Sequence, residues 1–310
     1  MGPGFSFRLH DPDEGPARHA KKPRLLVRTH TFGPTRRIVP VLGQGTWQMH
    51  HRGTRAAPAA HALRLGIQLG LTHIDTAELY GDGRAEEIVG EAIAAVSRER
   101  LFIVSKVLPQ HASYEGTIQA CDASLRRLRT DYLDVYLLHW PSRYPLADTM
   151  AALEALVDAG KIRALGVSNF DVDDLEEARA ALRRHPLACD QVLYHLRERR
   201  IEHRVLNYCR AHDIALVAYS PFGSGDFPAP RSSGGRVLDE IACGHGATMR
   251  QVALAFLTRD DGMFAIPKAE QAEHVRENAA AGDLTLSTAQ IAAIDAAFPV
   301  GRPAANLPTL

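Results

Sequence analysis

The sequence predicts an α/β protein: a (β/α)8 barrel of the TIM type, with an N-terminal β-hairpin and an extra C-terminal helix. Short apolar stretches alternate with amphipathic stretches of helical periodicity eight times between residues 41 and 280. Two β-like stretches joined by a turn precede this alternation, and a helix-capping sequence follows it. Strand–helix alternation indicates parallel strands with helical crossovers, and eight repeats favour a closed barrel over an open sheet.

The hairpin is predicted from residues 25–31 and 37–41, which are β-like and flank the turn composition Phe32-Gly33-Pro34-Thr35. Residues 1–22 are polar, contain Gly and Pro, and lack the apolar segment of a secretory signal. We therefore expect residues 1–22 to form a flexible extension and residues 23–310 to form a single domain.

The barrel elements follow in order. The predicted strands are the short apolar runs at residues 41–45, 71–75, 101–106, 133–138, 163–167, 187–191, 214–219 and 263–267. The predicted helices between them span residues 56–70, 84–97, 115–128, 147–159, 173–183, 203–212, 236–258 (in two pieces) and 270–280.

Local signals support individual helices. In the third helix Ile118, Cys121, Leu125 and Leu128 recur at helical spacing, which predicts one buried face. Gly160 follows the fourth helix, where a left-handed cap is expected. The capping box that begins at Ser287 predicts the extra helix at residues 288–297.

Composition narrows the function classes. Lys plus Arg and Asp plus Glu cancel at 36 each, which argues against a nucleic acid or an anionic membrane held by net charge. No apolar run approaches the ~18 residues of a membrane span. The four cysteines show no CxxC spacing, so we expect reduced, mostly buried thiols and a cytoplasmic protein. The sequence carries no signal for oligomeric state, and we expect a monomer or weak oligomer.

Polar groups terminate nearly every predicted strand at its C-terminal end, which is the end where barrels of this type carry their reactive groups. Each of these residues could be polar simply because its strand ends at the solvent. That explanation does not account well for polar residues at the same end of nearly every strand. In chain order these residues are Gly45, Thr46, Trp47, Asp75, Lys106, His139, Ser168, Asn169, Gln191, Tyr219, Ser220 and Lys268.

Four residues on neighbouring strands form a chemical unit: Asp75, Tyr80, Lys106 and His139. A tyrosine ionises near pH ~10, so proton transfer at neutral pH needs a nearby cation. We expect Lys106 to lower the pKa of Tyr80 and Asp75 to hold Lys106 charged and in place. His139 would orient a substrate carbonyl by a hydrogen bond.

From about residue 25 to residue 298 the sequence resembles the aldo-keto reductase family, most closely its bacterial, methylglyoxal-reductase-like members. Eight segments match in order and spacing, which is far more specific than any one of them. They are VLGQGTW at 41–47, HIDTAELY at 73–80, VSK at 104–106, YLLHW at 136–140, GVSNF at 166–170, QVLYHL at 191–196, AYSP at 218–221 and IPK at 266–268.

The resemblance implies reduction of small aldehydes or ketones, for example 2-oxoaldehydes, by hydride from NADPH, with Tyr80 as proton donor. It also implies that Asp75, Tyr80, Lys106 and His139 are the catalytic tetrad. Trp47 and Trp140 could be plain core aromatics, but their place at strand ends favours walls of the substrate pocket. The residues that the resemblance assigns to cofactor binding are Gly45, Thr46, Trp47, Ser168, Asn169, Gln191, Tyr219, Ser220, Phe222, Ser224, Lys268, His274, Glu277 and Asn278. Among these, Ser168, Asn169 and Gln191 match the carboxamide contacts, Tyr219 the ring stacked on the nicotinamide, Lys268 the adenosine phosphate contact, and Glu277 and Asn278 the adenine contacts.

Three features depart from the family pattern. Ala269 stands where Ser or Thr often follows the lysine, and His274 stands where many NADPH-preferring members have Arg. The tail after Phe298 is short and rich in Pro and Gly, so we expect a reduced C-terminal loop and an open pocket that favours small carbonyls.

Other interpretations of these residues carry less support. Lys106 could be the Schiff-base lysine of an aldolase barrel, but that chemistry would give Asp75 and Tyr80 no catalytic role. Gly43-Gln44-Gly45 lacks the third small residue and the following helix of a Rossmann fingerprint. The His50-His51 pair has no further ligand at metal spacing, so we expect exposed loop histidines and no metal site.

Two functions from different classes remain open at this stage. The first is the reductase. The second is a cofactor-sensing subunit that binds a nicotinamide cofactor without useful turnover. The complete set of Asp75, Tyr80, Lys106 and His139 favours the enzyme.

Overall fold

The computed structural model describes Met1 and residues 27–49, 56–303 and 307–310. Eight parallel strands lie side by side in chain order. They are β3 (Gln44–Gly45), β4 (His73–Asp75), β5 (Phe102–Val107), β6 (Leu133–Leu138), β7 (Ile162–Ser168), β8 (Leu187–Leu193), β9 (Ala215–Tyr219) and β10 (Met263–Ala265).

Backbone contacts between the first and last strands close the sheet into a barrel. Leu42 forms a parallel bridge with Ala265. The amide of Gly43 donates to the carbonyl of Ala265 at 2.8 Å, and the amide of Ala265 donates to the carbonyl of Val41 at 2.9 Å. Because this closure removes both sheet edges, strand ends that are far apart in the sequence share one rim.

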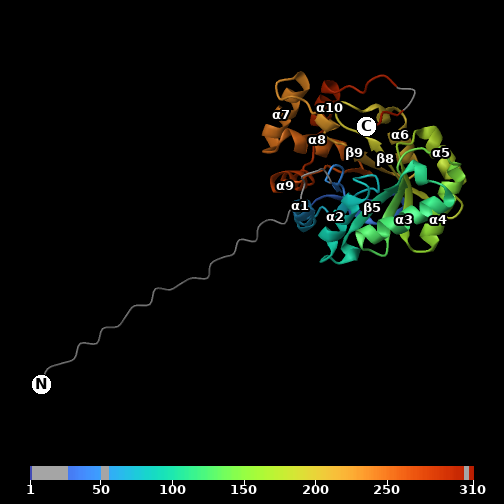
Figure 1. Ribbon diagram of the computed structural model, residues 1–310. Helices are drawn as coiled ribbons and strands as arrows, with labels where there is room; N and C mark the ends of the chain where they lie inside the picture. The colour runs from blue at the N-terminus through green and yellow to red at the C-terminus, as the bar shows by residue number, and fades with distance from the viewer. Residues whose placement is uncertain (2–26, 50–55, 304–306) are drawn as a thin grey trace.

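Helices surround the strands on the outside, as Figure 1 shows. They are α1 (Ala56–Gln68), α2 (Arg84–Ile93), α3 (Tyr114–Leu128), α4 (Leu146–Asp158), α5 (Val172–Ala181), α6 (Val205–Ala211), α7 (Ser233–His245), α8 (Met249–Leu257), α9 (Ala272–Ala281) and α10 (Thr288–Ala297). The predicted (β/α)8 barrel with its extra C-terminal helix α10 is therefore confirmed, and the capping box at Ser287 is present.

The predicted hairpin is also confirmed over its described part. Strand β1 (Thr29–Thr31) pairs antiparallel with β2 (Ile38–Pro40). The turn between them places Phe32 in the N-terminal end of the barrel, where its ring centroid lies 4.7 Å from that of Phe102 and 4.8 Å from that of Phe264. The hairpin thus closes the N-terminal end of the barrel. The polar residues lie at the other end, where the strands terminate.

One predicted helix start was wrong for an identifiable reason, and one position that was predicted to be buried was wrong as well. Helix α7 begins at Ser233 rather than near 236, because Ser232 caps it through the amide of Gly235 at 3.0 Å. Two glycines in its first turn conceal the start in the sequence, yet a Cβ at Gly235 would lie 2.0 Å from a backbone oxygen. In the third helix Ile118 is only partly buried, whereas the other three positions of its predicted face are buried.

Some predictions lie outside the described residues. These are the extension at residues 1–22 apart from Met1, the first two residues of the predicted strand at 25–31, and the His50-His51 pair.

Candidate active site

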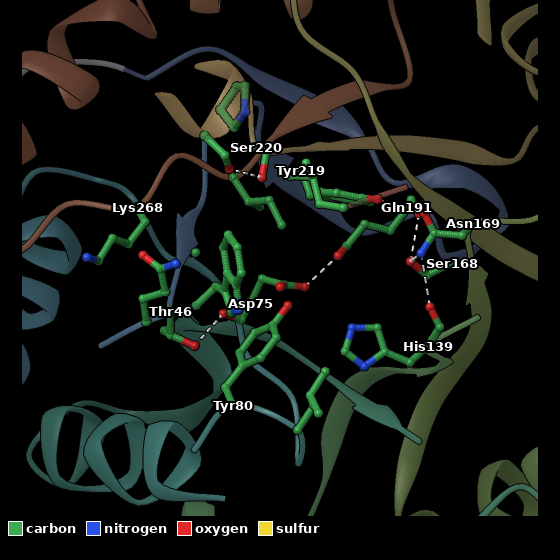
Figure 2. A pocket seen from close by; sticks show the side chains of 18 of the residues that line it. Thr46, Asp75, Tyr80, His139, Ser168, Asn169, Gln191, Tyr219, Ser220 and Lys268 are labelled. Carbon is green, nitrogen blue, oxygen red and sulfur yellow. Dashed lines mark hydrogen bonds between the residues drawn. The ribbon is translucent and has the colours of Figure 1, made fainter. Parts of the chain in front are cut away.

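A pocket of about 380 Å³ opens at the C-terminal end of the barrel strands. Residues at or just after the ends of β3, β4, β6, β7, β8, β9 and β10 line it, and Figure 2 shows their side chains converging. The predicted site residues among them are Gly45, Thr46, Trp47, Asp75, Tyr80, His139, Trp140, Ser168, Asn169, Gln191, Tyr219, Ser220, Phe222, Ser224 and Lys268.

Lys106 at the end of β5 lies directly beneath this pocket, with its side chain fully buried. Its Nζ donates to Oδ1 of Asp75 at 2.6 Å, to the carbonyl of Thr76 at 2.8 Å and to the phenol of Tyr80 at 3.2 Å. An ammonium has three donors, so all of them are used. The lysine therefore connects a buried carboxylate to the hydroxyl that faces the pocket.

Charge and burial act against each other in this cluster. Burial acts to lower the pKa of Lys106, but Asp75 and Tyr80 outweigh it and raise that pKa, so the ammonium is kept. Burial raises the pKa of Tyr80 even though Lys106 pulls it down. The net lowering of the Tyr80 pKa expected from the sequence was therefore wrong for this structure, since desolvation exceeds the attraction of one ammonium. The phenol is protonated at neutral pH.

His139 faces Tyr80 across the pocket, with ring centroids 5.8 Å apart. Burial, together with the nearby Lys106 ammonium, lowers the pKa of His139 to about 2. A neutral imidazole carries one N–H donor and one acceptor. His139 and Tyr80 can thus present two neutral donors to one oxygen atom.

A second hydrogen-bonded chain lines the wall formed by β7, β8 and β9. Ser168 Oγ donates to the carbonyl of Gln191 at 2.7 Å, and Tyr219 donates its phenol proton to Asn169 Oδ1 at 2.9 Å. Asn169 has a φ of 62°, a left-handed conformation that Asn tolerates better than most residues. Gln191 extends this chain to the tetrad, because its side-chain amide donates to Oδ2 of Asp75 at 2.7 Å.

The far end of the pocket is polar and cationic. Ser224 Oγ donates to Ser220 Oγ at 3.1 Å. Lys268 lies on the opposite side of the pocket from His139, as Figure 2 shows, and its Nζ pairs with Glu270 at 2.7 Å. A long ligand in this pocket would therefore meet the Tyr80 cluster at one end and a lysine at the other.

Three predicted cofactor residues do not line this pocket. His274 is exposed on α9, whereas Asn278 is buried. Glu277 instead receives a hydrogen bond from the hydroxyl of Thr248 at 2.6 Å.

Five lining residues were not predicted from the sequence: Gln48, Leu79, Pro221, Ile266 and Leu310. Leu79 and Pro221 lie inside matched motifs, so position alone could have indicated them. Leu310 carried no such signal, and it shows that the last described residues of the tail reach the pocket.

Two further expectations concern metals and membranes. Over the described residues, no group of three or more His, Cys, Asp or Glu side chains is arranged to hold a metal ion. Over the same part of the chain, no helix combines the length and the apolar character needed to cross a membrane. All four cysteines are free thiols, and three of them are buried.

Comparison with known proteins identifies the family. The sequence profile of the Aldo/keto reductase family matches residues 41–298. The chain belongs to the aldo/keto reductase family. Among curated relatives, methylglyoxal reductase YeaE of Escherichia coli is 45% identical over 84% of this chain and 92% of its own length. Glyoxal reductase of Bacillus subtilis is 38% identical over 83% of this chain and 88% of its own length.

Solved structures of other family members agree with the barrel. An aldo-keto reductase from Klebsiella pneumoniae in complex with NADPH superimposes with a TM-score of 0.85 at 42% identity, covering 92% of this chain and all of the other. A Klebsiella pneumoniae aldo/keto reductase in complex with NADP and acetate gives 0.83 at the same identity and coverage. The resemblance to this family inferred from the eight sequence motifs is confirmed.

Proposed function

We propose that this family member is an NADPH-dependent reductase of small aldehydes and ketones, 2-oxoaldehydes among them, with Tyr80 as the proton donor. The observation that carries the proposal is the position of Lys106 Nζ, 2.6 Å from the Asp75 carboxylate and 3.2 Å from the Tyr80 hydroxyl at the floor of a pocket. The curated relatives named methylglyoxal and glyoxal reductases, and the solved relative bound to NADPH, support it.

The residues of the pocket fit a nicotinamide dinucleotide. Ser168, Asn169 and Gln191 offer hydroxyl and amide groups for a carboxamide, and Tyr219 offers an aromatic ring beside them. Lys268 at the opposite end offers a cation for a phosphate. When bound, the cofactor would supply the hydride that reaches the carbonyl carbon.

The side chains of the protein would donate the proton and stabilise the negative charge that develops on the carbonyl oxygen. The hydroxyl of Tyr80 donates its proton to the carbonyl oxygen, and the Lys106 ammonium stabilises the phenolate that remains. His139, which stays neutral, donates a hydrogen bond to the same oxygen and holds the carbonyl toward Tyr80. Asp75 keeps Lys106 charged and fixed.

The outer walls of the pocket favour small carbonyl compounds. Trp47 is 41% exposed and Trp140 is 37% exposed, so both present aromatic surface at the mouth. Leu79 and Leu310 add apolar surface. We further propose that residues 23–310 act as one domain and that the reductase works in the cytoplasm, where its four free cysteines stay reduced.

A panel of carbonyl substrates tests the proposal. Loss of NADPH absorbance would be followed with methylglyoxal, glyceraldehyde, nitrobenzaldehyde and a steroid ketone. We expect the first three to exceed the steroid in kcat/KM. A preference for the steroid would refute the assigned substrate class. A single burst of cofactor oxidation without further turnovers would refute the enzyme and favour a cofactor sensor.

A further inference from the structure

An arginine outside the predicted site is held against the cationic end of the pocket. Arg250 is the second residue of α8. Its guanidinium carbon lies 4.9 Å from the ring centroid of Phe222 and 4.9 Å from that of Phe227. The two rings meet edge to face, 5.8 Å apart. Since Phe222 lines the pocket, this contact places the guanidinium next to the pocket wall.

The pairing of Arg250 differs from that of the two other arginines that lie over phenylalanine rings in the described part of the chain. Arg259 and Arg199 both lie over Phe256, and both also bind the carboxylate of Glu202. In the part of the chain that the structure describes, no carboxylate lies within ion-pair distance of Arg250. Aromatic contacts fix a guanidinium without using its N–H donors, so its five donors stay available.

The contacts of α8 place Arg250 near the end of the pocket where Lys268 lies, which the proposed function assigns to the adenosine part of the cofactor. The hydroxyl of Thr248, which caps α8, donates to Glu277, and the side-chain amide of Gln251 donates to the carbonyl of Glu277 at 2.9 Å. Helix α8 therefore contacts α9, which begins a few residues after Lys268, while Arg250 on the same helix contacts the pocket residue Phe222. Figure 1 shows α8 and α9 as neighbours, and contacts between them are extensive.

We propose that Arg250 is a specificity residue for the cofactor: it binds the adenosine 2′-phosphate that distinguishes NADPH from NADH, together with Lys268. This inference rests on the proposed function. It also bears on the departure at His274: both side chains are exposed and neither lines the pocket, but the guanidinium of Arg250 lies over Phe222, which does line it. A planar guanidinium from α8 takes the place of the one that position 274 lacks.

Dissociation constants measured without turnover test the proposal. NADP+ and NAD+ would each be titrated by calorimetry into the wild type, Arg250→Ala and Arg250→Lys. Loss of one charged hydrogen bond corresponds to about a tenfold or greater weakening. We expect Arg250→Ala to weaken NADP+ binding by about tenfold and NAD+ binding by less than about threefold. Arg250→Lys should lie between the wild type and Arg250→Ala.

A matched control variant distinguishes the effect of Arg250 on cofactor binding from that of a nearby exposed arginine. Arg276 is an exposed arginine on α9 whose guanidinium donates to the carbonyl of Ala272 on its own helix at 3.2 Å. Arg276→Ala should leave both dissociation constants unchanged. Selective loss of NADP+ binding in Arg276→Ala, with none in Arg250→Ala, would overturn the assignment.

Three other outcomes also decide the matter. If Arg250→Ala weakens NADP+ and NAD+ equally, the guanidinium stacks on the adenine instead and the phosphate role is wrong. If the wild type binds neither dinucleotide, the proposed reductase function fails. If the wild type binds NADP+ tightly and Arg250→Ala does so equally, only the role of Arg250 fails.

Discussion

The side-chain amide of Gln191 donates to one oxygen of Asp75 at 2.7 Å, while Lys106 binds the other oxygen at 2.6 Å. Both oxygens of a carboxylate that is only 1% exposed are thereby satisfied inside the barrel. This carboxylate joins the wall that we assign to the nicotinamide carboxamide with the cation beneath Tyr80. A change at any of these side chains should therefore affect both stability and chemistry.

The buried ion pair leads to a prediction about stability. Lys106→Met removes the cation and leaves the Asp75 carboxylate buried, so the free energy of unfolding should fall by about 3–5 kcal/mol. The double variant Asp75→Asn with Lys106→Met removes both charges and should recover most of that loss. Urea denaturation of the three proteins would measure this. Equal stability of the single and double variants would show that Asp75 does not need its partner.

A second prediction isolates the proton donor. Tyr80→Phe keeps the ring above Lys106, whose Nζ lies 4.9 Å from the ring centroid, and removes only the hydroxyl. Turnover should fall by about 10² or more while the dissociation constant for NADPH stays nearly unchanged. Steady-state kinetics and fluorescence titration would check both quantities. A variant that keeps most of the wild-type rate would exclude Tyr80 as the donor.

Much of the fold and of this site could be predicted from the sequence. Strand 133–138 and helix 288–297 match the structure residue for residue, because apolar runs and a capping box are local signals. The four residues of the tetrad also meet, since barrel closure brings neighbouring strand ends together. The Gln191–Asp75 contact could not be predicted, because it depends on side-chain rotamers of strands β4 and β8. The reach of Leu310 into the pocket depends on the path of a tail with no periodic pattern.

The third prediction concerns His139, whose pKa is lowered to about 2 by burial and by Lys106. The imidazole should remain neutral from pH 5 to pH 8, so it should add no ionisation to the profile of kcat/KM there. Proton NMR of the ring, assigned by comparison with His139→Asn, would follow its titration. A midpoint above pH 5 would contradict the neutral-donor role.

His73 gives a fourth prediction, on acid stability. Its ring is buried among Phe32, Phe102 and Phe264, and burial lowers its pKa to about 3. Between pH 3 and about 6.5 the unfolded chain binds a proton at this position that the folded chain does not. Folding stability should therefore fall as the pH falls through this window, by up to about 1.4 kcal/mol per pH unit from this residue.

Replacement of the ring tests that prediction. His73→Leu conserves most of the volume and removes the titrating group. Its free energy of unfolding should fall between pH 7 and pH 5 by about 2 kcal/mol less than that of the wild type. Denaturant titrations at both values would measure the difference. Identical pH dependence of the two proteins would place the acid sensitivity elsewhere.

The last prediction concerns the preference for NADPH over NADH. Lys268 lines the pocket and offers an ammonium donor to a phosphate there, although it also pairs with Glu270 at 2.7 Å. A charged hydrogen bond to phosphate is worth roughly 1.5–3 kcal/mol, so Lys268→Ala should reduce the preference in kcat/KM by about tenfold to a hundredfold.

A histidine gains charge as the pH falls through about 6.5, and a phosphate contact from His274 would make the preference rise with acidity. Because His274 is exposed and lies outside the pocket, we expect the preference to stay nearly constant between pH 6.5 and 8.5. Initial rates with each cofactor across that range would measure it. A preference that increases several-fold toward pH 6.5 in the wild type but not in His274→Ala would show that this histidine binds the phosphate after all.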